Sequence, residues 1–175
     1  YIEHGKLKAK KCVQLDRLFT DMVEFLENTG ALTVAFCQAG DFIGGVKGQR
    51  FNEKVIRKAM NSFFCCTDRP FQFVGTMNED VTMYTTLGSR GALIMSITDC
   101  AIIQAATQKT KGGMSEAYAD GGTFLKSFYS VMSMPSAVKV SMLNSSHKRI
   151  HHKINWPCCV PKIINEKYRK RRKEP

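Results

Sequence analysis

Apolar residues near the start of the chain recur at helical spacing. From Val13 to Leu26 they fall three or four positions apart, and Asn28-Thr29-Gly30 follows as a stop signal. This pattern predicts a helix over residues 13–28. A short apolar run with β-branched residues comes next, at 31–37, and predicts a buried strand.

The rest of the pattern alternates strand-like and helix-like segments. The segments 63–66 and 71–74 are apolar and are joined by a turn-forming stretch, which predicts two strands. Further along, the pattern predicts a helix at 81–87, a strand at 92–97, a helix at 123–132 and a strand at 137–142. The strands and helices intermix without a repeat, so we expect an α/β fold with a mixed sheet flanked by helices.

Two adjacent carboxylates follow the predicted strand at 71–74. Glu79 and Asp80 come directly after Asn78, a residue type that often caps helices, and Gly75 lies just before them. Carboxylates at a strand end lie where α/β enzymes keep catalytic groups. We therefore take Asp80 and Glu79 as candidate acid–base residues. The simpler alternative is that both acids only complement the helix dipole, a contribution of about 0.3–1 kcal/mol.

A second polar cluster lies far downstream. Arg149, His151 and His152 precede the single tryptophan, Trp156. A neutral imidazole is a good ligand for a divalent ion, and a guanidinium group can bind a phosphate. Surface or packing roles for the two histidines are the alternative.

Three glycine pairs interrupt the chain, at 44–45, 112–113 and 121–122. None belongs to a dinucleotide-binding or P-loop motif, so ordinary turns are expected. Gly44 and Gly45 follow Asp41 in a glycine-rich loop, where the missing side chains would allow a ligand to approach the backbone.

The composition favours a polyanionic partner. The formal net charge is +11, and from His147 onward ten Lys or Arg against two Glu contribute +8 of it. We expect one domain over residues 1–166 and a solvated basic tail over 167–175. No apolar run approaches the ~20 residues that span a bilayer, so a membrane partner is not expected. The seven cysteines, without a C-x-x-C pair, favour a reducing compartment.

The ordered set of these motifs resembles the TET-associated glycosyltransferase family. The resemblance rests on residues 38–45, the Asn78-Glu79-Asp80 motif, the segment 123–132 and the segment 149–156, and it spans most of residues 12–168. The stretch around Asn78 also resembles the acceptor motif of GT-A glycosyltransferases.

The resemblance implies a metal-dependent enzyme that moves a sugar from a nucleotide-sugar, such as a UDP-sugar, to a hydroxyl. In phage members of the family the expected acceptor is a hydroxymethylpyrimidine in DNA. Carried onto this chain, Asp80 would be the general base, Glu79 would contact the acceptor, and Asn78 and Gly75 would belong to the acceptor site.

The family resemblance also implies a donor site and a metal site. Arg149 and Lys153 would neutralise the donor diphosphate, with Gly44 and Gly45 beside it. His151 or His152 would hold Mn²⁺ or Mg²⁺.

One departure from the GT-A pattern is the lack of an Asp-x-Asp metal motif in this chain. In the family the motif would lie just before the helix at 13–28. The chain begins at Tyr1 rather than Met, so we expect that motif and the first nucleotide-binding strands to lie upstream.

Two alternatives use the same residues. A non-catalytic nucleic-acid-binding protein would account for the basic charge without a donor site. A metal-dependent nuclease would use clustered acids and histidines, although the chain lacks a second acidic cluster. The expected location is the cytoplasm of an infected host for a phage protein, or the nucleus for a eukaryotic one.

Overall fold

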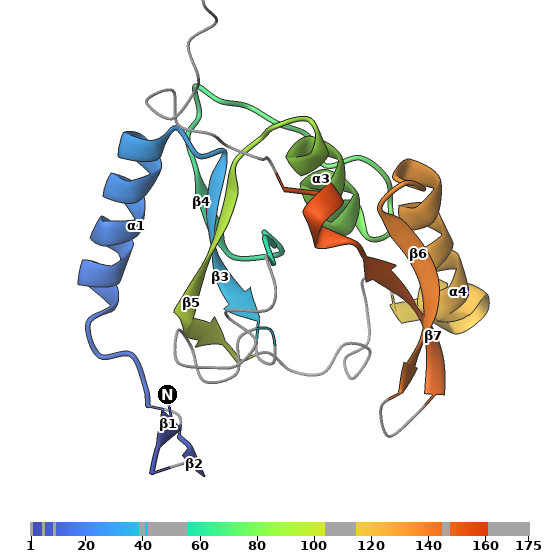
Figure 1. Ribbon diagram of the computed structural model, residues 1–175, viewed down its shortest axis with the longest axis horizontal. Helices are drawn as coiled ribbons and strands as arrows, with labels where there is room; N and C mark the ends of the chain where they lie inside the picture. Colours follow the sequence, from blue (N-terminus) through green and yellow to red (C-terminus); the bar gives the residue numbers. More distant parts are fainter. Residues whose placement is uncertain are drawn as a thin grey trace, which may run out of the picture.

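A three-stranded sheet lies at the centre of the computed structural model, which describes residues 2–4, 6–8, 10–38, 41, 56–103, 115–144 and 148–160 (Figure 1). Helix α1 (Leu15–Thr29) covers one face of this sheet. Helix α3 (Glu79–Ser89) covers the other face. Beyond α3 lies a hairpin of β6 (Val138–Asn144) and β7 (Lys148–Ile154), against which α4 (Ser115–Ser133) packs. A two-residue strand pair, β1 (Ile2–Glu3) and β2 (Lys6–Leu7), precedes α1.

The sheet has the order β4-β3-β5 and is mixed. Strand β3 (Thr33–Gln38) pairs antiparallel with β4 (Phe63–Cys65) and parallel with β5 (Ile94–Ile102). The predicted α/β class with a mixed sheet is confirmed. Alternation along β3 sends Val34 toward α1 and Ala35 toward α3, so one strand serves two cores.

Helix α1 ends as the sequence predicts. Gly30 adopts a left-handed conformation with φ of 65°, the usual conformation after a helix C-terminus. The Arg69 guanidinium donates hydrogen bonds to the carbonyl oxygens of Leu26 and Ala31, at 3.2 and 2.8 Å. A cation that binds these carbonyls also complements the negative end of the helix dipole.

The predicted strand at 71–74 is wrong. This segment has no regular secondary structure, and the Phe71 and Phe73 rings instead pack around Phe63, with centroids 5.6–6.1 Å apart. The aromatic side chains therefore determine its path. The carboxylates of α3 follow an irregular segment and not a strand end.

Other boundaries also shift. Helix α4 begins at Ser115, well before the predicted start at residue 123. Gly121 and Gly122, which were expected to form a turn, lie within this helix. Strand β5 continues to Ile102, beyond the predicted 97. Segment 149–156, for which no element was predicted, supplies most of β7 and the start of the 3₁₀ turn η2 (Trp156–Cys158).

Helix α3 packs closely on the turn that follows the hairpin. A Cβ atom on Gly88 would lie 2.0 Å from the carbonyl oxygen of Cys159, so only glycine fits at this contact. The Tyr84 ring stacks on Trp156 with centroids 5.5 Å apart. These contacts fix α3 relative to β7 and thereby position the site described below.

Within the part of the chain that the structure describes, no helix has the length and apolar character needed to cross a membrane.

Candidate functional site

A cavity of about 300 Å³ brings together the two polar clusters that the sequence singled out. It lies between the start of α3, helix α4 and strand β7. Its lining includes both predicted acids and both predicted histidines, together with two lysines that the sequence did not indicate: Asn78, Glu79, Asp80, Lys58, Lys126, His151 and His152. The carboxylates and the histidines therefore belong to one site.

Asn78 precedes the first residue of α3, but its side chain makes no capping hydrogen bond. Its backbone is left-handed, with φ of 52°, and its side chain is 4 % exposed. The amide nitrogen lies 3.0 Å from the carbonyl oxygen of Lys126, 3.0 Å from Ser130 Oγ and 3.2 Å from His152 Nδ1. Asparagine tolerates this backbone better than most residues, and here it ties α3 to α4 and to β7.

Asp80 and Glu79 differ in environment although they are neighbours in the sequence. Burial raises the pKa of the Asp80 carboxyl, and the neighbouring Glu79 raises it further, while the Val81 backbone hydrogen bond and Lys126 act in the opposite direction. Glu79 is exposed to solvent. A carboxylate that is partly desolvated, and so more basic, suits proton abstraction, and Asp80 meets that requirement.

A second cavity of about 660 Å³ adjoins the first and shares Lys58, His151 and His152 with it. Lys139 and Lys153 line this second cavity and occupy directly opposed positions in the β6–β7 ladder. Like charges at opposed positions repel each other, so a bound anion would stabilise them. Ile56, Ile154, Trp156 and Pro157 add an apolar wall.

His152 lies at the junction of the two cavities. Burial lowers the pKa of its imidazole to about 3, with further contributions from His151, Lys126 and Lys58. The ring is therefore neutral at neutral pH. The ring centroids of His151 and His152 are 4.2 Å apart.

The other predicted site residues lie outside this geometry. Gly75 is exposed and adopts a φ of 99°, so glycine is required there by the backbone turn before α3. Gly44 and Gly45 lie outside the described residues, and for Arg149 only the backbone, in β7, is described. Asp41, which precedes the glycine pair, forms an ion pair with Lys58 at 2.6 Å.

The described residues do not contain a set of ligands for the predicted metal ion. Nowhere in them do three or more His, Cys, Asp or Glu side chains lie close enough together to hold an ion. His151 and His152 supply nitrogen ligands, whereas Mg²⁺ in proteins is held by oxygen ligands.

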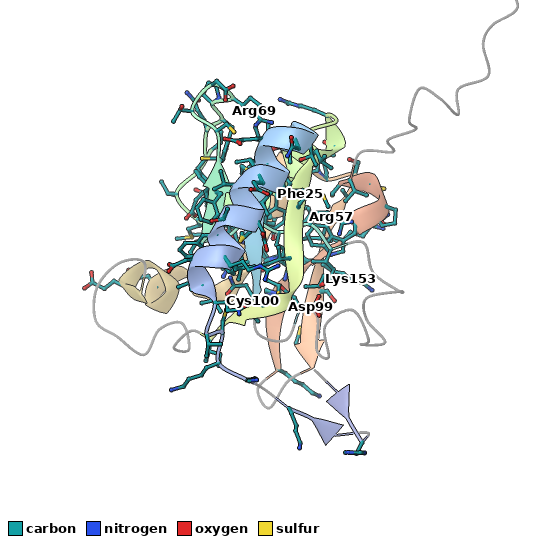
Figure 2. The ribbon with its side chains drawn as sticks, turned by 90° about the vertical axis from the view of Figure 1, so that its left-hand side faces the viewer. Phe25, Arg57, Arg69, Asp99, Cys100 and Lys153 are labelled. Carbon is teal, nitrogen blue, oxygen red and sulfur yellow. The ribbon has the colours of Figure 1, made fainter. Side chains whose placement is uncertain are left out.

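A larger cavity, about 800 Å³, lies on the opposite side of the sheet, against α1. Figure 2 shows that face, with Phe25, Arg57, Asp99 and Cys100 around the helix and the β5 strand. Its other lining residues combine apolar side chains, such as Leu18, Met22 and Val34, with polar and charged ones, such as Arg17 and Asp21. Volume alone favours this cavity, but none of the predicted site residues whose side chains the structure describes lines it.

The family model for TET-associated glycosyltransferases matches residues 1–113, more than half of the chain. The chain belongs to this family. Membership gives glycosyl transfer as the general class of activity and a nucleotide-sugar as the general class of donor. No curated protein and no solved structure shows detectable similarity to the chain.

The TET-associated glycosyltransferase match covers the first of the two polar clusters, Asn78-Glu79-Asp80, and ends before β6 and β7. The histidines and Lys153 are linked to the family region by the three-dimensional contacts of Asn78 and by the shared cavity lining.

Sequence reasoning missed Lys58, Lys126 and Lys139 as site residues, and it gave Trp156 only a place in a motif. No periodicity or motif signals the three lysines, because they lie in separate segments that only folding brings together. Lys139 offers one usable signal, its place in a strand predicted to alternate.

Proposed function

We propose that this protein transfers a sugar from a UDP-sugar to the hydroxyl of a hydroxymethylpyrimidine in DNA. One observation carries the proposal: two adjoining cavities share Lys58 and both histidines. The first also contains the two carboxylates, and the second also contains Lys139 and Lys153. Glycosyl transfer needs these two chemistries, a base for the acceptor hydroxyl and positive charge for the departing diphosphate.

In the first cavity, Asp80 takes the proton from the acceptor hydroxyl as its oxygen bonds to the anomeric carbon. The raised pKa of Asp80 supports this role, since burial makes the carboxylate a better base. Glu79, exposed at the rim, contacts the acceptor. Asn78 has committed its amide nitrogen to protein partners, so its amide oxygen is the atom that can meet an acceptor.

In the second cavity, Lys153 neutralises the diphosphate as the bond between the sugar and the phosphate oxygen breaks. Lys139 adds positive charge to the same cavity, which Lys58, paired with Asp41, also lines, and Trp156 offers an apolar wall to the rest of the nucleotide. Arg149, on the same strand, is a further candidate for diphosphate binding.

A divalent metal, Mn²⁺ or Mg²⁺, is the cofactor that the family resemblance implies. Because the described residues do not supply its ligands, no step of the proposed reaction is assigned to it. Deprotonation by Asp80 and charge neutralisation by the lysines are functions of this chain's own side chains.

The charge of the chain supports DNA as the acceptor. The net charge of +11 favours a polyanion, and phosphate contacts supply most sequence-independent affinity for DNA. The basic tail at 167–175, proposed to contact the DNA backbone, lies outside the described residues.

The test is a transfer assay with hydroxymethylated DNA, a UDP-sugar and Mn²⁺, read by the mass of the modified nucleoside. We expect a gain of one sugar per modified base and no gain on unmodified DNA. No transfer, together with no UDP binding by calorimetry and salt-sensitive DNA binding, would instead support the non-catalytic nucleic-acid-binding alternative.

A further inference from the structure

The orientation of the Asn78 amide is determined by its surroundings. The backbone oxygen of Lys126, 3.0 Å away, can only accept a hydrogen bond, so the Asn78 atom that faces it must be the amide nitrogen. The same nitrogen faces Ser130 Oγ and His152 Nδ1. With the side chain 4 % exposed and held by α4, this orientation has little freedom.

This orientation dictates the protonation of His152. The Asn78 amide nitrogen carries two hydrogens for three partners, so the Lys126 carbonyl oxygen takes one, and Ser130 Oγ and His152 Nδ1 share the other. A hydrogen on Nδ1 would point at a group that only donates, so Nδ1 turns its lone pair toward the amide. In a neutral imidazole the single proton then resides on the other nitrogen, Nε2. Burial keeps the ring neutral, in agreement with its lowered pKa.

We propose that Asn78 is a positioning residue that fixes His152 as the Nε2–H tautomer, so that His152 donates a hydrogen bond to a phosphate oxygen of the bound nucleotide. The ligand in this statement rests on the proposed function, whereas the tautomer rests on the hydrogen bonds alone. His152 and Lys58 line both cavities, so a phosphate at the junction meets a neutral donor and a cation.

The arrangement is the reverse of a metal-binding histidine. A ligating imidazole donates its second N–H to a carboxylate or carbonyl oxygen, which leaves the other nitrogen free for the ion. Here the partner is a donor, so Nδ1 is occupied and Nε2 carries hydrogen. In this proposal His152 is a hydrogen-bond donor to the ligand, a different role from the metal ligand that the family resemblance implies.

Asn78 gives up helix capping and adopts an unfavourable backbone conformation in this arrangement. Asparagine before the first turn of a helix usually caps it, but here the amide turns inward to His152 and the backbone adopts a left-handed conformation. That departure is explained if the contact with His152 is what the position requires.

The tautomer is read directly by ¹H–¹⁵N NMR of the protein with ¹⁵N-labelled histidine, with His152 assigned through the His152→Gln variant. We expect hydrogen on Nε2 and none on Nδ1 in the wild type. In Asn78→Asp the new carboxylate accepts a hydrogen bond, so the proton should move to Nδ1. Ser130→Ala, which removes a different partner of the same amide, should leave the tautomer unchanged.

The donor role is read by adding UDP alone. We expect the Nε2–H signal of His152 to shift on binding, and Asn78→Asp to weaken UDP binding about tenfold or more, as for a lost hydrogen bond to a charged group. A wild-type His152 with a bare Nε2 would overturn the inference, even if Asn78→Asp does not fold. UDP binding without any change at Nε2–H would overturn the donor role.

The two proposals fail differently. If UDP does not bind at all, the donor site of the proposed function and the phosphate contact both fall, while the tautomer result still stands. If UDP binds and sugar is transferred but Nε2 is bare, the proposed function survives and Asn78 loses its positioning role.

Discussion

The two faces of the β4-β3-β5 sheet are built in different ways. On the α1 face, apolar side chains such as Met22, Leu26 and Val34 pack together, and Met22 and Val34 also border the cavity of about 800 Å³. On the α3 face, Asn78 bonds to partners 48, 52 and 74 positions away in the sequence, beside two smaller cavities. Volume and chemistry thus indicate different faces. A buried polar network with shifted pKa values is the stronger indication of function. Burying polar groups lowers the stability of the fold unless each group has a hydrogen-bond partner.

The largest expected effect is on the rate of sugar transfer when the proposed general base is removed. Asp80→Asn should reduce the rate of sugar transfer by about 10²–10⁴-fold, the usual contribution of general-base catalysis. The assay is transfer to hydroxymethylated DNA at saturating UDP-sugar. Asp99→Asn, which changes an exposed acid of the α1-face cavity, is the matched control and should retain the wild-type rate. Full activity of Asp80→Asn would remove Asp80 from the base role.

The close packing of α3 on η2 requires glycine at position 88. Gly88→Ala places a methyl group 2.0 Å from the Cys159 carbonyl oxygen, so the backbone must shift, at a cost of about 3 kcal/mol in the free energy of unfolding. Urea unfolding measures the change. At Gly91 no atom of the described residues lies within 4 Å of an added Cβ, so Gly91→Ala should cost only the strain of its positive φ, about 1–2 kcal/mol. Equal effects at both positions would contradict the close packing of α3 on η2.

Removal of a lysine from the α3 face should weaken UDP binding, whereas removal of a cation from the α1 face should not. Lys153→Ala should weaken UDP binding about tenfold, and Lys139→Ala should do the same, because each removes a cation from the cavity proposed for the diphosphate. Arg17→Ala removes a cation from the α1-face cavity and should leave the affinity unchanged. Calorimetric titration with UDP measures all three. Weaker binding only in Arg17→Ala would move the donor to the α1 face.

The smallest expected effect is on the pH dependence of stability. The pKa of His152 falls from 6.5 to about 3 on folding, so the unfolded chain binds a proton more readily between these values. The stabilisation is present above pH 6.5 and is lost as the pH falls toward 3. The difference in unfolding free energy between the wild type and His152→Gln should therefore shrink as the pH falls through this range. Urea unfolding at a series of pH values tests this, and a constant difference would show that His152 is not buried in neutral form.

Elements with a strong periodic pattern were predicted well from the sequence. Helix α1, strand β3 and the C-terminal Gly30 follow from apolar spacing and one glycine, which are local signals. The segment 71–74 was predicted wrongly, since aromatic residues that pack on Phe63 resemble a strand when read alone. In α4, tertiary packing on the hairpin overrides the turn preference of Gly121 and Gly122.

The candidate site was predictable only in parts. The residue types of Asn78, Asp80 and His152 drew attention to two clusters, but the sequence did not indicate whether they meet. Their meeting depends on α4 and on the β6–β7 register, which places His152 opposite Val140 and leaves its ring against Asn78. The lysines of the two cavities come from separate segments and carry no local signal.

The central claim is that the nucleotide binds on the α3 face, between the lysines and the histidines. A crystal structure of the protein with UDP tests it most directly. We expect the diphosphate beside Lys153, Lys139 and Lys58, with His152 Nε2 within hydrogen-bonding distance of a phosphate oxygen. UDP in the cavity beneath α1, between Arg17 and Arg57, would contradict it.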